Sequence, residues 1–280
     1  MSGAQRNAVM STVTARRSKT RLDAALAARG LAPTREKAAR LILAGGVLVD
    51  GRRADKAGAL VTESSRIEVL APPRYVSRGG DKLAHALTVF GIDVRGRVCL
   101  DAGASTGGFT HCLLEAGAAR VIAVDVGSHQ LDASLRADPR VEVRDRINAR
   151  SLAPADFPQP PTLATVDVSF ISLEKVLPAV FGVLAVGGEA VALVKPQFEV
   201  GKGQVGKGGV VRDPAQHRRV LEGVAAFAAR AGWGMRGATR SPLRGPAGNR
   251  EFFLHLVQGE SVSDLDARIE VETRPTGADA

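Results

Sequence analysis

The sequence predicts two folded regions: a small α+β domain and then a larger α/β domain with a mainly parallel, doubly wound sheet. The 280 residues are 45% hydrophobic and 24% charged, so the chain has enough apolar side chains to form real cores. Residues 1–80 hold 15 basic and 6 acidic side chains, whereas residues 81–280 hold 23 of each. From about residue 97, short apolar runs alternate with helical segments, as in doubly wound sheets. The net charge of +9 therefore belongs to a small basic domain joined to a larger neutral one.

Composition also excludes several classes of protein. Two cysteines, Cys99 and Cys112, are too few for a disulfide framework and lack metal-site spacing, which favours a reduced, cytoplasmic protein. The first twenty residues contain no apolar run long enough for a signal peptide. The longest apolar stretch, residues 180–194, is interrupted by Gly187 and Gly188 and is shorter than the roughly 20 residues that span a bilayer. We interpret it as a helix end, a turn and a buried strand, and expect no stable membrane association.

The expected domain boundaries follow from composition and from the motifs described below. The last thirty residues carry seven acidic and two basic side chains, which is typical of a disordered segment. The predicted order is a disordered tail, a small basic domain, a linker, a large domain and an acidic tail, over residues 1–19, 20–72, 73–81, 82–260 and 261–280.

The small domain is predicted to contain two helices and a short antiparallel sheet. The first helix covers residues 20–30, with Thr20 as its N-cap and Gly30 as its stop. The second covers residues 34–46, with Thr34 as its cap and a Gly-Gly pair as its end. Alternating runs at 47–51 and 65–70, the first ending in an Asp-Gly turn, then predict antiparallel strands.

Basic side chains of this domain suit a phosphate backbone, although an ordinary solvated face explains their charge equally well. The run RLDAALAARGLAPTREKAARLILAGGVLVDG resembles the S-four-like RNA-binding domain, named after ribosomal small-subunit protein four. With aromatics at 4% and Tyr75 the single tyrosine, a base-stacking platform is disfavoured relative to recognition of RNA shape and phosphates. The candidate RNA-binding residues are Arg35, Lys37, Arg40, Arg52, Arg53 and Arg78.

In the large domain, the loop DAGASTGGFT at 101–110 follows a strand and opens a helix, where an α/β sheet binds a nucleotide. The dinucleotide spacing Gly-x-Gly-x-x-Gly is absent. Asp125 ends the next strand, where a carboxylate binds ribose hydroxyls, so an adenosine ligand is expected. The pairing resembles a site for S-adenosyl-L-methionine (AdoMet), with Asp145 facing the adenine or, alternatively, Asp138, Arg146 or Asn148. The candidate cofactor-binding residues are Asp101, Gly103, Ser105, Thr106, Gly107, Gly108, Asp125 and Asp145.

The end of this domain departs from the βα alternation. Residues 213–232 predict a long amphipathic helix, followed by two strands around the loop PLRGPAGN. Two terminal strands of this kind indicate a β-hairpin at one sheet edge, as in class I (Rossmann-like) AdoMet-dependent methyltransferases.

Four polar residues lie where strand ends and loops should meet beside that pocket: Lys82, Asp167, Lys195 and Glu251. They resemble the Lys-Asp-Lys-Glu tetrad of FtsJ-like ribose 2′-O-methyltransferases. A 2′-hydroxyl is a weak nucleophile, so its oxygen must be held close to the methyl group and its proton must be accepted. Lys195 could act as the base once deprotonated. Alternatively, it stays charged and stabilises the developing alkoxide while a carboxylate or water accepts the proton.

Further segments have weaker interpretations. The glycine-rich loop 199–213 lacks the P-loop spacing and is interpreted as a lid or RNA-contact loop, or as a plain connection. No metal site is expected from the scattered histidines, His85, His111, His129, His217 and His255. Cys99 and Cys112 are expected in the core rather than as nucleophiles.

Residues 20–258 together resemble the TlyA (haemolysin A-like) family of ribosomal RNA 2′-O-methyltransferases. The motifs SRGGDKL, LDAGASTGGFT, TVDVSFISL, LVKPQFE and GGVVRD carry this resemblance. It implies AdoMet-dependent methylation of cytidine ribose in small- and large-subunit rRNA within assembled subunits, with no protein partner. The alternatives are a membrane-active haemolysin and a non-catalytic RNA-binding ribosome assembly factor.

Overall fold

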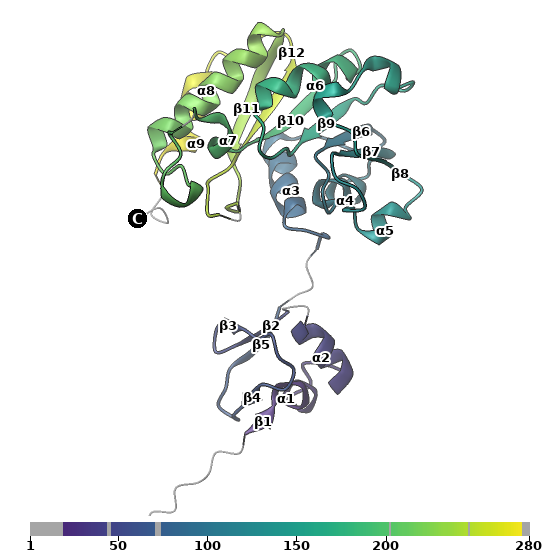
Figure 1. Cartoon of the computed structure of the whole chain (residues 1–280), viewed down its shortest axis with the longest axis vertical. Helices are drawn as coiled ribbons and strands as arrows, with labels where there is room; N and C mark the ends of the chain where they lie inside the picture. Colours follow the sequence, from purple (N-terminus) through teal and green to yellow (C-terminus); the bar gives the residue numbers. More distant parts are fainter. Residues whose placement is uncertain (1–18, 44–45, 71–73, 202, 246, 276–280) are drawn as a thin grey trace, which may run out of the picture. The chain divides into compact units, whose positions relative to one another are not determined.

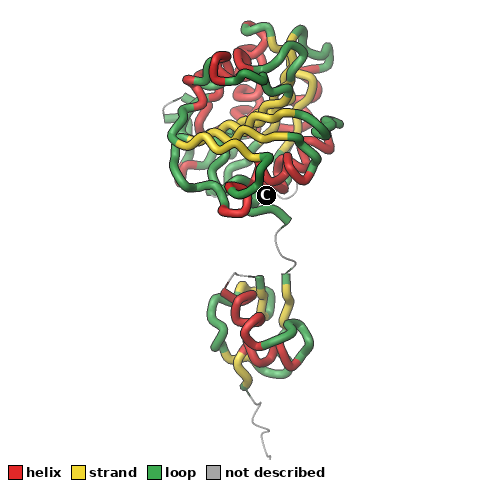
Figure 2. Tube along the Cα trace, turned by 90° about the vertical axis from the view of Figure 1, so that its right-hand side faces the viewer, coloured by secondary structure: helices red, strands yellow, loops and turns green. Residues whose placement is uncertain are grey.

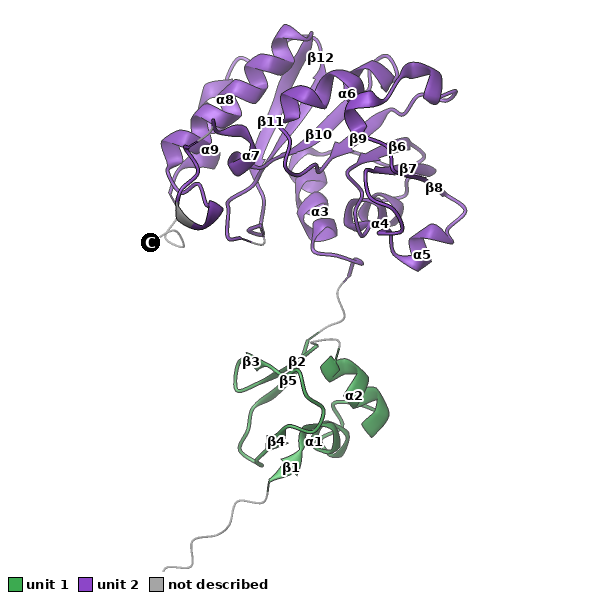
Figure 3. Cartoon of the chain, viewed as in Figure 1, with its two compact units in different colours: residues 1–72 green, residues 73–280 purple. Residues whose placement is uncertain are grey.

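The computed structural model of the chain describes residues 19–43, 46–70, 74–201, 203–245 and 247–275. The chain divides into two compact units, residues 1–72 and 73–280 (Figure 3). The predicted tail at 1–19 lies outside the described residues except for Lys19. The segment predicted as a linker at 73–81 is not wholly irregular, because a helix begins within it at Gly79.

The small unit packs two helices on short antiparallel strands. β2 pairs with β3 and with β5, and β1 pairs with β4. The predicted Asp-Gly turn between β2 and β3 is confirmed, because Asp50 and Gly51 adopt the left-handed φ values of 50° and 76° that such a hairpin needs. The elements are β1 (Thr20–Arg21), α1 (Leu22–Ala28), α2 (Arg35–Leu43), β2 (Val47–Val49), β3 (Arg52–Arg53), β4 (Leu60–Val61) and β5 (Ile67–Val69).

The start of α1 differs from the prediction. Thr20 does not cap the helix but lies in β1, opposite Val61. Instead Asp23, in the first turn, accepts a hydrogen bond from the Ala24 amide and forms ion pairs with Arg21 and Arg35 at 2.8 and 3.0 Å. A carboxylate is favourable at this position because the helix N-terminus carries partial positive charge. Thr34 does cap α2, accepting from the Lys37 amide at 3.2 Å.

The large unit contains a seven-stranded sheet with helices on both faces (Figures 1 and 2). The strand order is β11-β12-β10-β9-β6-β7-β8. The five strands from β8 to β10 are parallel, whereas β12 runs antiparallel to both β10 and β11. The predicted edge hairpin and the class I order are therefore confirmed. The strands are β6 (Val98–Ala102), β7 (Arg120–Asp125), β8 (Val141–Asp145), β9 (Leu163–Val166), β10 (Glu189–Val194), β11 (Trp233–Arg240) and β12 (Phe252–Gln258).

Each face of this sheet has its own core, because successive strand side chains point to opposite faces. Leu100 belongs to the core beneath the helices α6 and α8, whereas its neighbour Cys99 belongs to the core beneath α3 and α4. Burial raises the pKa of the Cys99 and Cys112 thiols to about 12, which fits their predicted core position. The helices are α3 (Gly79–Phe90), α4 (Gly108–Glu115), α5 (Ala133–Arg136), α6 (Leu177–Val183), α7 (Pro196–Glu199), α8 (Pro214–Arg230) and α9 (Leu265–Thr273).

The expected disordered acidic tail at 261–280 is wrong for the residues that form α9. Ile269 is fully buried in the core of the large unit, and Leu265, one turn earlier, packs against that core. Two of the acidic residues that suggested disorder form i,i+4 ion pairs instead, Asp264 with Arg268 and Glu270 with Arg274. The acidic composition does not reveal Leu265 and Ile269, the two apolar residues through which the helix packs on the core.

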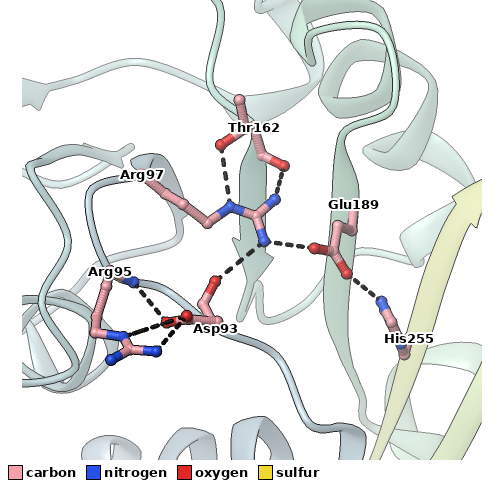
Figure 4. A network of polar contacts seen from close by, with 6 residues as sticks. All are labelled: Asp93, Arg95, Arg97, Thr162, Glu189 and His255. Atoms are coloured by element: carbon pink, nitrogen blue, oxygen red, sulfur yellow. Dashed lines mark hydrogen bonds and ion pairs between the residues drawn. The ribbon is translucent and has the colours of Figure 1, made fainter.

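A polar cluster links the amino ends of the central parallel strands (Figure 4). Arg97, just before β6, donates to the Thr162 hydroxyl at 3.1 Å and to the Thr162 carbonyl, and forms an ion pair with Glu189 at the start of β10. His255 Nε2 in β12 lies 2.6 Å from Glu189 Oε2. The hydrogen bond from His255 and the charge of Arg97 lower the pKa of Glu189 to about 2. This cluster lies at the sheet end opposite the site described next.

Candidate active site

A pocket of about 500 Å³ opens at the carboxyl ends of β6, β7 and β9. Parallel α/β sheets bind ligands at this end, and the volume lies within the ~300–1,000 Å³ typical of small-molecule sites. Of the predicted cofactor-binding residues, Gly103, Ser105 and Asp125 line it.

Asp125 is held in place by the loop that follows β6. Its two carboxylate oxygens accept hydrogen bonds from the Ser105 amide at 2.8 Å and the Gly127 amide at 2.7 Å. Ser105 has a φ of 48°, which non-glycine residues rarely adopt. Each carboxylate oxygen keeps a further lone pair, so Asp125 can accept from two hydroxyl groups of a ligand without losing its own partners.

The glycines of the loop serve different purposes. A Cβ on Gly103 would lie 2.5 Å from the Asp167 carbonyl oxygen, so only glycine allows β6 and β9 to approach this closely. Gly107 and Gly108 face other elements: a Cβ on the first would overlap Leu135, and on the second the Ser77 side chain. Thr106 accepts a bond from the Asp132 amide through its carbonyl. The sequence predicts that Thr106, Gly107 and Gly108 bind the cofactor, but they contact neighbouring elements at the start of α4 and are not among the residues that line the pocket.

Asp101 does not line the pocket. It is fully buried beneath α4, where the hydroxyls of Thr110 and Thr165 donate to it at 2.7 and 3.2 Å. Burial, with the nearby Asp167 charge, raises the pKa of Asp101 to about 7. The side chain supports the base of the loop instead of a ligand.

Asp145 is also absent from the pocket lining. It forms an ion pair with Arg136 at 3.0 Å and accepts from the His129 amide at 3.2 Å. Asn148, one of the alternatives considered for the adenine, does line the pocket beside Ile147.

The four tetrad residues form two ion pairs. Lys195, after β10, lies 2.6 Å from Asp167, after β9, and donates to Ser169 Oγ at 2.8 Å. Lys82 in α3 lies 2.5 Å from Glu251, just before β12. Because Val194 is opposite Phe252, Lys195 and Glu251 occupy the next positions on adjacent strands. The predicted convergence of strand ends therefore occurs.

The two pairs differ in accessibility. Asp167 and Ser169 line the pocket, whereas Glu251 is only 2% exposed and is covered by the backbone of Gly245. Asp167 Oδ1 is buried against the Lys195 ammonium, 2.6 Å away, whereas the Asp167 side chain as a whole is 22% exposed and lines the pocket. The carboxylate therefore keeps acceptor capacity that a ligand hydroxyl can use.

Comparison with known proteins identifies the larger unit. The FtsJ-like methyltransferase model matches residues 75–258, and the S4 domain model matches residues 20–67. A Mycobacterium tuberculosis protein named 16S/23S rRNA (cytidine-2′-O)-methyltransferase TlyA is 52% identical over 85% of this chain and 90% of its own length. The chain belongs to the TlyA family of FtsJ-like methyltransferases.

Other relatives agree with this assignment. A Campylobacter jejuni protein named 23S rRNA (cytidine-2′-O)-methyltransferase TlyA is 34% identical over 71% of this chain and 77% of its own length. A solved Streptococcus thermophilus structure, described as a candidate hemolysin, is 42% identical with a TM-score of 0.71, covering 91% of this chain and 96% of that chain. The hemolysin name is thus another label within the family. In the described part of the chain, no helix has the length and apolar character to cross a bilayer.

The predicted RNA-binding residues of this TlyA family member lie in both units. Lys37 and Arg40 on α2, and Arg52 and Arg53 on β3, are exposed, whereas Arg35 is engaged with Asp23. Arg78 belongs to the large unit, where it donates to the Arg244 carbonyl at 3.0 Å.

Two pocket residues escaped the sequence analysis. Ser169 fixes the Lys195 ammonium, and Phe170 is 90% exposed beside the pocket with its ring 5.0 Å from that of Phe198. Phe170 has a left-handed φ of 63°. An apolar residue that follows a buried strand is normally predicted to lie in the core. The hydrophobic pattern therefore contains no signal for this exposed ring, and only the unusual backbone angle marks the residue.

Proposed function

We propose that this protein transfers the methyl group of AdoMet to the 2′-hydroxyl of cytidine in 16S and 23S rRNA. The observation that carries this proposal is the Lys195–Asp167 ion pair of 2.6 Å at the rim of the pocket, with Asp167 lining the pocket wall. The substrate is inferred from the name of the 52% identical relative.

The pocket fits AdoMet by its size and polarity. Asp125 would accept from the ribose hydroxyls, and Ile147 and Asn148 would flank the adenine. Gly103 lines the pocket, so its backbone would contact the methionine part. When bound, AdoMet supplies an electrophilic methyl group on a sulfonium.

Lys195 and Asp167 would activate the ribose hydroxyl together. The Lys195 ammonium, held by Asp167 and Ser169, donates to the 2′-oxygen and stabilises the charge that develops there. The Asp167 carboxylate, which lines the pocket, would accept the hydroxyl proton as the new oxygen–carbon bond forms and the sulfur–carbon bond breaks. We assign the base to Asp167 because an ammonium in an ion pair has no lone pair to offer.

Lys82 and Glu251 would hold Lys195 and Asp167 in position. Their pair is nearly fully buried at the strand end beside Lys195, and breaking a buried pair exposes the remaining charge to a low dielectric. The exposed arginines and lysines of the S4 domain would bind rRNA phosphates within assembled subunits. Such a protein would act in the cytoplasm, where ribosomes are, and would need no protein partner.

The test is methyl transfer from labelled AdoMet to small subunits, large subunits and naked rRNA, with the methyl group mapped by its block to 2′-hydroxyl-dependent cleavage. We expect a 2′-O-methylcytidine that is absent with Lys195→Ala. AdoMet binding without transfer to any rRNA would contradict the proposal and favour a binding role in ribosome assembly. Leakage from liposomes by RNA-free protein would favour the haemolysin alternative.

A further inference from the structure

A second pocket of the large unit is lined by arginines. It lies between the segment 208–213, the β11–β12 connection 241–250, the first turn of α8 and the end of α9. Its volume of about 110 Å³ is below the ~300–1,000 Å³ of sites that hold whole ligands, so it suits a group of phosphate size. None of the described residues that line it is acidic, and its arginines are Arg212, Arg244, Arg250 and Arg274.

The walls of this arginine pocket are fixed by buried side chains. Asn249, which is 1% exposed, accepts from the Val211 amide and donates to the Gly209 carbonyl, both at 2.9 Å. His217 in α8 is buried with its Nε2 2.9 Å from the Val211 carbonyl oxygen. Two loops distant in sequence are thereby joined, and both emerge at the same end of the sheet (Figure 1). A pocket built in this way is preorganised for a ligand.

Two carboxylates beside the arginine pocket in sequence accept hydrogen bonds from backbone amides. Asp213 caps α8 by accepting from the Ala215 amide at 2.9 Å, and Glu272 accepts from the Arg240 amide at 2.7 Å. Glu270 forms an ion pair with Arg274 and so partly neutralises the charge of that arginine. Burial, and to a smaller extent the charge of Arg250, hold the pKa of His217 below its usual value.

The same β11–β12 connection touches the tetrad. A Cβ on Gly245 would lie 2.5 Å from Glu251 Oε1, so the backbone that carries Arg244 packs directly on the Glu251 carboxylate. Arg250 immediately precedes Glu251. Arg78, at the start of α3 and one turn before Lys82, donates to the Arg244 carbonyl at 3.0 Å. One loop therefore forms a wall of both sites.

We propose that Arg212, Arg244 and Arg250 bind a backbone phosphate of the RNA strand whose ribose enters the tetrad. This inference rests on the proposed function and adds a phosphate subsite to it. Guanidinium groups match phosphate oxygens through paired N–H donors, and a small rigid pocket admits a phosphodiester but not a base. The contact holds the strand beside Glu251 and so limits how the 2′-hydroxyl can approach Lys195.

The test compares the full-length double variant Arg212→Gln/Arg244→Gln with the control Arg219→Gln/Arg236→Gln, which removes the same charge from exposed arginines outside this pocket. Methyl transfer to ribosomal subunits is measured at several salt concentrations. We expect the first variant to raise KM about ten-fold. The slope of log KM against log salt concentration should also fall by the amount expected for about one phosphate contact. Its AdoMet affinity and thermal stability should match the parent.

Equal KM values and salt slopes for the two double variants would overturn this inference. The parent is assayed first, because a failure of the proposed function would appear as absence of transfer by the parent itself. In that event the same variants are compared for equilibrium binding of an rRNA fragment. A selective loss with the arginine-pocket variant supports the phosphate subsite, and equal binding contradicts it.

Discussion

The two ends of the central sheet each carry buried or half-buried charges, but they differ in whether the pocket described above reaches those charges. At the amino end, Arg97 and Glu189 use their polar atoms on Thr162, His255 and each other. At the carboxyl end, Lys195 and Asp167 form an ion pair at the pocket, and Asp167 lines the pocket wall.

This difference indicates that the amino-end cluster stabilises the fold, whereas the carboxyl-end pairs serve the reaction. A satisfied network in a low dielectric fixes the strands and offers nothing to a ligand. Charged groups on a pocket wall stay within reach of a ligand, and ionisable pairs placed in this way are typical of functional sites. The amino-end cluster should therefore respond to mutation through unfolding, and the carboxyl-end pairs through turnover.

Removing the proposed base gives the largest expected effect. In Asp167→Asn the carbonyl oxygen can still contact Lys195, but the side chain can no longer accept the hydroxyl proton. We expect kcat to fall by about 10²–10⁴ with little change in melting temperature. Single-turnover methyl transfer and calorimetry measure the two quantities. A variant with parental kcat would assign the proton to another acceptor.

Glu189→Gln should produce the reverse pattern. It keeps the shape but removes the charge shared by Arg97 and His255, so we expect a loss of about 2–3 kcal/mol in unfolding free energy with parental transfer by the folded protein. Because the pKa of Glu189 is lowered to about 2, its contribution is complete above pH ~4.5 and is lost as pH falls toward 2. Denaturant unfolding at pH 7 and pH 3 tests this, and a loss that did not shrink at pH 3 would contradict the assignment.

Asp101→Asn should give the smallest effect, and one of opposite sign. The pKa of Asp101 is raised to about 7, so the parent protein loses stability as pH rises from about 4 to 7. The neutral amide avoids this, and we expect a melting temperature about 2–4 °C above the parent at pH 8, with a smaller gain at pH 5. Equal gains at both pH values would show that Asp101 is already ionised.

The sequence was sufficient for the architecture because βα alternation, strand-end acids and a terminal hairpin follow from local patterns. It was also sufficient for the tetrad, since Asp167 and Lys195 both follow strands that end at one edge of the sheet. It did not distinguish Asp125 from Asp101. Asp101 precedes the last residue of β6 and shares a face with Cys99, so α4 covers it, whereas Asp125 is the final residue of β7.

Other failures have a similar physical origin. Asp145 also ends a strand, but Arg136 from α5 pairs with it, a contact between elements that spacing does not encode. Phe170 is exposed although it is apolar, and its left-handed backbone angle is not encoded in the hydrophobic pattern. In α9, the burial of Ile269 and the packing of Leu265 outweigh an acidic composition.

The central claim is that Lys195 and Asp167 act as one unit on the 2′-hydroxyl. A double-mutant cycle tests it most directly, by measuring single-turnover methyl transfer to ribosomal subunits with Lys195→Met, Asp167→Asn and the combined variant. Groups that act together should be strongly non-additive, so the double variant should be no slower than the slower single variant. Rate losses that multiply across the two substitutions would show independent roles and would contradict the account.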